Sequence, residues 1–162
     1  MTPLVRCFES RADASALTLR QSTAGVGVGA ADERASIERF LDRKPGMSFV
    51  AEQDGQLLAT ILCGHDGGRG LSRQLVVAPQ ARRRGLARSL LRPSVRALHS
   101  SGIDNCHVLV FRDNPEGAAF WRSVSAAERH DLALFSLSTG IGDRTHGAMA
   151  PPLHLGRTDA PM

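Results

Sequence analysis

The chain has 162 residues, which is the usual length of one globular domain. Its hydrophobic fraction of 42% and charged fraction of 22% are ordinary for a globular protein, and no stretch approaches the roughly 18 apolar residues of a membrane span. The first residues lack the layout of a signal peptide, and the 3 cysteines suit neither a disulfide framework nor a zinc site. We therefore exclude the secreted and disulfide-rich classes and expect a cytoplasmic domain with no metal and no membrane contact.

The net charge of +4 is small, but arginine is concentrated in one stretch. Lys44 is the only lysine, so nearly all basic residues are arginines. The stretch contains no acidic residue, and such a focused positive field favours an anionic partner, either a phosphate-bearing cofactor or a nucleic acid. The clustered residues are Arg82, Arg83, Arg84, Arg88, Arg92 and Arg96.

The first part of the chain is predicted to contain one strand and two helices. Residues 5–8 are expected to form the strand, and Ser10 is expected to cap the first helix. Residues 24–30 are rich in glycine but do not form a GxGxxG pattern behind a strand, so a flexible loop is predicted there. Asp32 is expected to open the second helix, and Lys-Pro-Gly at 44–46 ends it.

A hairpin is predicted next. Strands over 48–52 and 56–64 flank Asp54-Gly55, a dipeptide that two-residue hairpin turns favour. The chain then turns again and enters a strand that ends at residues 75–77. Pro79 stops this strand, because proline cannot donate a hydrogen bond to a ladder.

The second half is predicted to continue with helices and strands in alternation. Residues 85–98 have the pattern of an amphipathic helix, although Pro93 in its middle costs about 3 kcal/mol unless the helix is kinked or split there. An apolar strand is predicted over 106–111, and a helix is expected to begin after Asn114, where a proline is tolerated. Residues 132–137 are predicted to form a final strand.

The sequence beyond residue 139 has no periodicity. It is dominated by Gly, Pro, His and Arg, which is typical of a segment that cannot bury an apolar face. We therefore expect one domain over residues 1–139 and a disordered tail over 140–162, with no internal repeat.

The stretch from residue 75 into the helix predicted at 85 combines the features of an anion site. A helix N-terminus presents backbone N–H groups that have no intrahelical partner, together with a partial positive charge. Small residues at Gly85 and Ala87 let a phosphate approach the main chain, and the neighbouring arginines add charge-assisted hydrogen bonds. No GxxxxGK[ST] loop is present, so the pattern indicates a pyrophosphate cradle that differs from a Walker loop.

Two motifs in this half of the chain belong together. A Val-x-Pro strand end is followed by the pattern [QR]-x-x-G-x-[GA], and a pattern close to Asn-x-x-Ala-x-x-Phe-[Tyr/Trp] opens the next helix, with Gly117 in place of the alanine. At these spacings the sequence resembles the GNAT superfamily of acetyl-CoA-dependent N-acyltransferases, over roughly residues 4–138. The matching residues are Val77, Pro79, Arg82, Gly85 and Ala87 in the first motif and Asn114, Phe120 and Trp121 in the second.

The resemblance implies an α/β fold. Its sheet would be mixed and mostly antiparallel, flanked by helices on both faces, and splayed open between the strand that ends at Val77 and the strand that ends at Phe111. Acetyl-CoA would lie in the splay as co-substrate, with its pantetheine arm on the main chain of one strand and its pyrophosphate on the amides of the arginine loop. The implied cofactor-binding residues are Leu75, Val76, Val77, Arg82, Arg83, Arg84, Gly85, Leu86, Ala87, Arg88 and Asn114.

The implied reaction is direct attack of a primary amine on the thioester, with no metal and no covalent enzyme intermediate. A base must take a proton from the amine, and Glu52 and His65 are the candidates. The usual acid of the family is a tyrosine at the place of Trp121, and this chain contains no tyrosine, so the thiol of coenzyme A would leave as a thiolate. Gln74 stands where related sequences place a histidine.

Two other functions remain open at this point. Gln74, Trp121 and Pro93 favour a catalytically inactive module that binds acyl-CoA without turnover. The arginine cluster alone would suit a nucleic-acid-binding protein with steeply salt-dependent affinity, but no aromatic residues interleave with it and no reader motif is present. We therefore expect no nucleic-acid partner and an amine of small-molecule or peptide origin as acceptor, and we leave a homodimer open.

Overall fold

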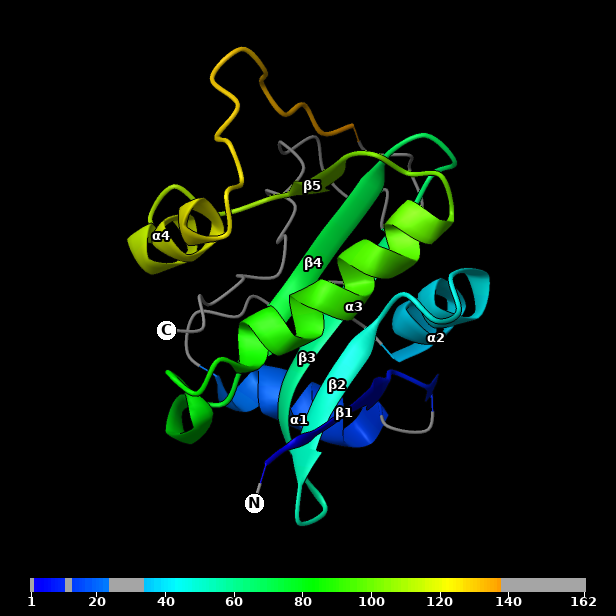
Figure 1. Ribbon diagram of the computed structural model, residues 1–162, viewed down its shortest axis with the longest axis vertical. Helices are drawn as coiled ribbons and strands as arrows, with labels where there is room; N and C mark the ends of the chain where they lie inside the picture. Colours follow the sequence, from blue (N-terminus) through cyan, green and yellow to red (C-terminus); the bar gives the residue numbers. More distant parts are fainter. Residues whose placement is uncertain (1, 11–12, 24–33, 138–162) are drawn as a thin grey trace, which may run out of the picture.

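The computed structural model describes residues 2–10, 13–23 and 34–137. Figure 1 shows the strands side by side with helix α3 lying over them. The strands are β1 (Leu4–Cys7), β2 (Phe49–Gln53), β3 (Gln56–His65), β4 (Gly70–Val77) and β5 (Cys106–Val108), and the helices are α1 (Asp13–Ser22), α2 (Arg34–Arg43), the short 3-10 helix η3 (Pro79–Ala81), α3 (Leu86–Ser100) and α4 (Pro115–Ser123).

The sheet is mixed. Its strands follow the order β1-β2-β3-β4-β5, and neighbouring strands are antiparallel except for β4 and β5, which are parallel. Helix α3 lies in the connection between these two parallel strands, as a parallel pair requires a crossover. The predicted α/β fold with a mostly antiparallel sheet is confirmed.

The predicted hairpin is present as β2 and β3. Asp54 and Gly55 in its turn have φ of 53° and 74°, so both central residues are left-handed, as a type I′ turn requires. The turn brings Gln53 opposite Gln56, and the ladder continues from there along β2. The dipeptide therefore forms the turn that the sequence predicts, and the register shifts at a bulge between Ala51 and Glu52.

Helices cover both faces of the sheet. Gly64 and Gly70 point to opposite faces, because Gly64 pairs with Leu71, the neighbour of Gly70. A Cβ at Gly64 would meet Phe40 of α2 at 2.9 Å, whereas a Cβ at Gly70 would meet Leu98 of α3 at 2.8 Å. Helix α2 therefore packs on one face and α3 on the other, and the core lies between them and the central strands. Strand β3 is buried along almost its whole length, as expected of a strand covered on both faces.

Strand β4 contains a bulge. Thr60 pairs with Val76 but Leu62 pairs with Arg73, so β4 carries one residue more than β3 between these two pairs. Gln74, inside the bulge, has φ of 53°, a left-handed value that residues other than glycine rarely adopt. A bulge of this kind bends a strand and increases its local twist.

Strands β4 and β5 part at the bulge. Their pairs run from Gly70 with Cys106 to Ser72 with Val108, and within the described ranges no later residue of β4 pairs with β5. Figure 1 shows the chain beyond β5 turning away from β4 toward α4. The splay predicted beside the strand that ends at Val77 is therefore confirmed.

Two predicted strands differ from the structure. The strand predicted over 106–111 ends at Val108, because its pairing with β4 stops there. The final strand over 132–137 is wrong: this segment has no regular structure. Apolar alternation forms a strand only against another strand edge, and no described strand pairs with the segment. Its apolar side chains are exposed, at 61% for Leu132, 63% for Leu134, 91% for Phe135 and 92% for Leu137.

Helix α3 is not split at Pro93. It runs from Leu86 to Ser100 with the proline inside it. The cost of about 3 kcal/mol for an interior proline is offset by the burial of the apolar face of the helix, which includes Leu90 and Leu98. The packing of α3 on the sheet therefore overrides the local preference.

Some predictions lie outside the described residues. They are the glycine-rich loop at 24–30, the helix start at Asp32 and the tail over 140–162, so the domain boundary at residue 139 stays a prediction. Among the described helices, none is long and apolar enough to cross a membrane.

Gly70→Ala should destabilise the fold. The new Cβ would lie 2.8 Å from the Cδ1 atom of Leu98 and 3.1 Å from the backbone oxygen of Asn105. Overpacking of this kind should lower the free energy of unfolding by about 1–3 kcal/mol, measured by urea denaturation. Gly68→Ala is the matched control, because the nearest atom to its Cβ is 3.7 Å away. Equal losses in the two variants would contradict this packing.

Candidate functional site

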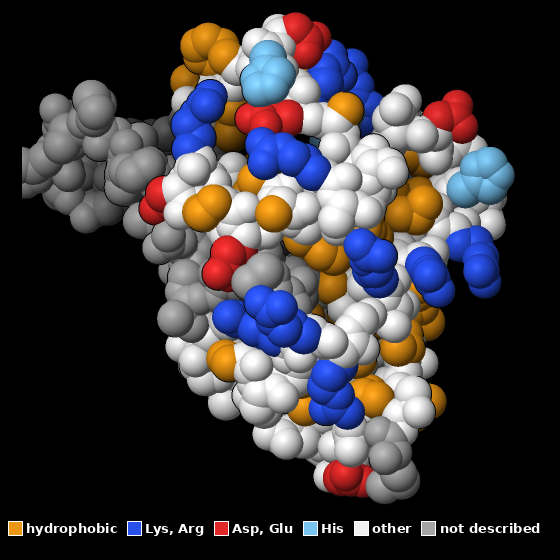
Figure 2. Space-filling view, turned by 60° about the vertical axis from the view of Figure 1, so that its left-hand side comes forward, with side chains coloured by type: hydrophobic (Ala, Val, Ile, Leu, Met, Phe, Trp, Pro, Cys, Tyr) orange, Lys and Arg blue, Asp and Glu red, His pale blue; other side chains and the backbone are white. Residues whose placement is uncertain are grey.

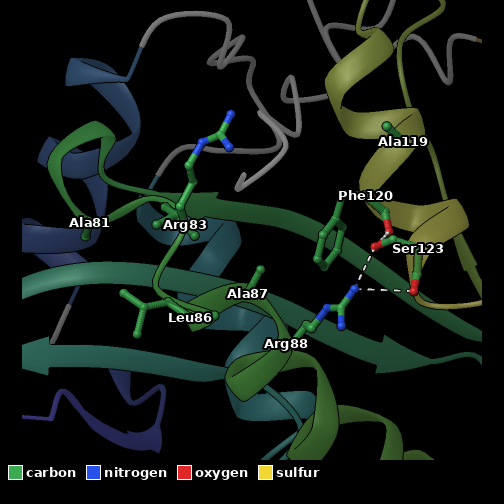
Figure 3. A pocket seen from close by; sticks show the side chains of 10 residues that line it. Ala81, Arg83, Leu86, Ala87, Arg88, Ala119, Phe120 and Ser123 are labelled. Atoms are coloured by element: carbon green, nitrogen blue, oxygen red, sulfur yellow. Dashed lines mark hydrogen bonds between the residues drawn. The ribbon is translucent and has the colours of Figure 1, made fainter.

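A cavity of about 330 Å³ opens where the end of β4, the loop after it, the start of α3 and helix α4 meet (Figure 3). We call it the α3–α4 pocket. It brings together six of the predicted cofactor-binding residues: Val77, Arg83, Gly85, Leu86, Ala87 and Arg88. The other lining residues are Ala81, Ala119, Phe120 and Ser123.

The loop before α3 has the geometry of an anion cradle. Gly85 caps the helix with a left-handed φ of 75°, and Arg83 is left-handed as well, with φ of 59°. The first hydrogen bond of the helical ladder runs from the N–H of Ser89 to the oxygen of Gly85, at 3.0 Å. The amides of residues 86–88 therefore precede the ladder and lie at the positive end of the helix dipole. Gly85 has no side chain, and apart from its chain neighbours nothing lies within 4 Å of where its Cβ would be, so there is open space beside its main chain.

The C-terminal end of strand β4 borders the site. Leu75, Val76 and Val77 are each at most 1% exposed. Their edge faces the splay, where β5 has already turned away. The three residues form a strand edge beside the pocket, and Val77 borders it directly.

Helix α4 forms the opposite wall. Asn114 caps it, and its Oδ1 accepts a hydrogen bond from the N–H of Gly117 at 2.9 Å. Phe120 lines the pocket, whereas Trp121 is buried, packs edge-on against Phe120 with ring centroids 5.3 Å apart, and does not line the pocket. Sequence reasoning missed Ala119, Phe120 and Ser123 as site residues. Their shared helix face could have indicated them once α4 was known to face the loop.

The arginines of the cluster divide between several places. Arg83 and Arg88 line the pocket, and they are its ionisable residues among those described. Arg84 turns away, because its Nη2 donates to the side-chain oxygen of Gln53 at 3.0 Å. Arg82 is half-buried behind the loop. Figure 2 shows basic side chains around a hydrophobic area on this side of the molecule.

Glu52, one of the two candidate bases, does not line the pocket. It lies on β2, separated from β4 by β3. Its carboxylate accepts two hydrogen bonds from Arg6 of β1, at 2.6 and 3.0 Å. Glu52 is therefore paired with Arg6 near the β1 edge of the sheet, away from the splay.

His65, the other candidate, lies at the opposite end of β4 from the pocket. Its Nδ1 accepts a hydrogen bond from the N–H of Gly67 at 3.0 Å. Ala59 pairs with Val77 and His65 pairs with Gly70, so at roughly 3.4 Å per residue His65 is about 20 Å along the sheet from the end of β4. Neither candidate base is brought together with the predicted cofactor-binding residues.

The carboxylates with shifted pKa values lie outside the pocket as well. Backbone N–H groups of Gly68 and Arg69 hold the pKa of Asp66 below its ordinary value. Hydrogen bonding to Arg129 lowers the pKa of Asp131 to about 2. Both are turn or surface interactions, so the described pocket owes its electrostatic character to arginines and helix amides.

Comparison with known proteins identifies the family. The model of the GNAT acetyltransferase family matches residues 14–125. An acetyltransferase of Photorhabdus laumondii is 32% identical over 106 residues, which cover 65% of this chain and 74% of that protein. An acetyltransferase of Pectobacterium atrosepticum is 35% identical over 83 residues, which cover 51% of this chain and 59% of that protein. The chain belongs to the GNAT acetyltransferase family.

Solved structures share the fold at low sequence identity. The aminoglycoside N-acetyltransferase AAC(6')-Iy in complex with a bisubstrate analogue matches with a TM-score of 0.68 at 15% identity, over 85% of this chain and 99% of that one. PaiA N-acetyltransferase of Thermoplasma acidophilum in complex with coenzyme A matches with a TM-score of 0.67 at 15% identity, over 76% and 89%. These similarities show a common fold.

Asn114→Ala should lower stability because it removes the cap of α4. We expect a loss of about 1 kcal/mol in the free energy of unfolding, the usual worth of an N-cap side chain. Asn114→Asp keeps the oxygen that accepts from Gly117 and should stay close to the unchanged protein. Urea denaturation of both variants measures the difference. Equal stabilities for the alanine and aspartate variants would show that the cap does not contribute to the free energy of unfolding.

Proposed function

We propose that this chain is an acetyl-CoA-dependent N-acetyltransferase that passes the acetyl group directly to a primary amine. The observation that carries the proposal is the α3–α4 pocket, where the splayed edge of β4, a left-handed loop and the N-terminus of α3 meet. Membership of the GNAT family and a fold shared with a coenzyme A complex support it.

The loop fits a pyrophosphate. The amides of residues 86–88 offer donors at the positive end of a helix, and the open space at Gly85 admits a phosphate to the main chain. Arg83 and Arg88 add positive charge on the pocket wall. We keep all the cofactor-binding residues predicted from the sequence as part of this proposal, with Arg84 contributing through its main chain.

The edge of β4 fits the amide-rich pantetheine arm. An extended ligand can add to a strand edge through main-chain hydrogen bonds, and residues 75–77 offer such an edge beside the splay. The bulge at Gln74 bends the strand at the end of this edge. In our proposal the thioester lies there, and backbone N–H groups of the strand hydrogen-bond to the oxyanion that forms on amine attack.

In our proposal the thiol leaves without help from a tyrosine. Bound acetyl-CoA supplies the activated acetyl group. Trp121 does not line the pocket, so it is not positioned as an acid, and we propose that the thiol of coenzyme A leaves as a thiolate and takes its proton from water. The attacking amine must be neutral, and we propose that water takes its proton.

Three finer points belong to the same proposal. The acceptor is a primary amine on a small molecule or a peptide, the class that the name of AAC(6')-Iy illustrates for one structural neighbour. The free cysteines suit a reducing compartment, so we place the protein in the cytoplasm. We propose that the chain acts without a metal ion, nucleic acid or membrane as partner.

Glu52→Gln should leave coenzyme A affinity and the pH dependence of the rate unchanged. The carboxylate is held by Arg6 outside the pocket, and an ion pair of this exposure is worth about 0–1 kcal/mol to stability. Arg6→Gln is the matched control for loss of the pair. A pH–rate profile that flattens in Glu52→Gln but not in Arg6→Gln would restore Glu52 as the base.

Calorimetric titration with coenzyme A and with acetyl-CoA tests the proposal. The unchanged protein should bind both, and Gly85→Glu should weaken binding at least about tenfold, because it places a negative charge beside the phosphates. Gly85→Asn is the matched control, since asparagine tolerates the left-handed φ of 75° at this position without adding charge. Equal losses in both variants would show that backbone strain, not charge, is responsible.

Release of free thiol from acetyl-CoA in the presence of a panel of amines then tests turnover. Thiol release that needs both acetyl-CoA and an amine is the expected result. Tight coenzyme A binding without release from any amine would instead support the inactive acyl-CoA-binding module. No binding to a folded sample would contradict the cofactor site itself.

A further inference from the structure

Arg88 spans the α3–α4 pocket from one wall to the other. It belongs to the first turn of α3, and its Nη2 donates to the hydroxyl of Ser123 at 3.0 Å and to the backbone oxygen of Ser123 at 3.4 Å (Figure 3). Both residues line the pocket. The bond therefore joins the two helices that form opposite walls of the pocket.

The same bond completes the C-terminal end of α4. The last carbonyls of a helix have no intrahelical donor and need other partners. In α4 the oxygen of Phe120 accepts from the Ser123 hydroxyl at 2.6 Å, and the oxygen of Trp121 accepts from the N–H of Val124 at 3.2 Å. Arg88 supplies the donor for the oxygen of Ser123, so a cation lies at the negative end of the α4 dipole.

The partners of Arg88 on α4 are uncharged. Hydrogen bonds to a charged group are stronger than bonds to a hydroxyl or a carbonyl, so a phosphate within reach would outcompete Ser123. The residue starts beside the amides of 86–88, where our proposed function places the pyrophosphate. Arg84, by contrast, is held by Gln53 on the hairpin and does not line the pocket.

We propose that Arg88 is an exchangeable latch, which holds Ser123 while the pocket is empty and moves to the pyrophosphate of coenzyme A when the ligand binds. This inference rests on the proposed function, because it needs a phosphate in the pocket. It assigns Ser123 a role as the competitor for Arg88. The contact between Arg88 and Ser123 must break before the arginine can donate to the phosphate of the ligand.

Titration of coenzyme A into Ser123→Ala and Arg88→Ala tests the exchange. Ser123→Ala removes the stronger competing acceptor and should tighten binding about fivefold, the worth of one ordinary hydrogen bond. Arg88→Ala should weaken binding at least about tenfold, the worth of a charged one. Ser123→Thr keeps the hydroxyl and should restore the affinity of the unchanged protein. Arg96→Ala, two turns further along α3 and outside the pocket, should have no effect.

The double variant Arg88→Ala with Ser123→Ala sharpens the test, because without the arginine the loss of the hydroxyl should no longer matter. Its affinity should equal that of Arg88→Ala alone. If Ser123→Ala leaves binding unchanged or weakens it, Arg88 is a fixed brace and the latch is refuted. Failure of the unchanged protein to bind coenzyme A is a different result, because it removes the proposed function. Melting curves without ligand establish that each variant is folded before its affinity is compared.

Discussion

The parting of β4 from β5 is the constraint on which the site depends. Three pairs join the strands, and the ladder stops at Ser72, just before the bulge that contains Gln74. A buried residue held at φ of 53° is costly, of the order of 1–3 kcal/mol, and persists only because the surrounding sheet imposes it. The bend leaves the edge of residues 75–77 facing a gap between strands. A flat sheet with the same residues would bury that edge in a ladder and have no place for an extended ligand.

The second requirement is that the loop after β4 delivers a helix end to this gap. Arg83 and Gly85, both left-handed, turn the chain so that α3 begins beside the end of β4. In the proposed function, its N-terminal amides, the open space at Gly85 and the positive side chains act on the same anion. Helix α4 closes the other side, and Arg88 ties it to α3 through Ser123. The edge of β4, the N-terminus of α3 and the side chain of Arg88 thus lie together at one candidate site.

The sequence predicted the parts of this arrangement that local chemistry determines. Asp54-Gly55 indicated the hairpin turn, and the small residues before α3 indicated the cradle. The left-handed Gln74, the bond from Arg88 to Ser123 and the pairing of Glu52 with Arg6 could not be predicted, because each depends on contacts between distant segments. The failed strand over 132–137 has the same cause: its alternating residues satisfied the local pattern, but a strand needs an edge to pair with. Trp121 shows the limit of motifs, since it matches one and yet lies beside the pocket rather than in it.

Hydrogen exchange of the backbone amides, with and without saturating coenzyme A, tests the central claim most directly, because the proposed contacts with the ligand are largely to main chain. Binding should slow exchange at residues 75–77 of β4 and at residues 86–88 at the start of α3, and should leave β1 and β2 unchanged. Slowed exchange at another surface, or none at these two segments despite measurable binding, would show that the splayed edge and the helix end are not where the ligand lies.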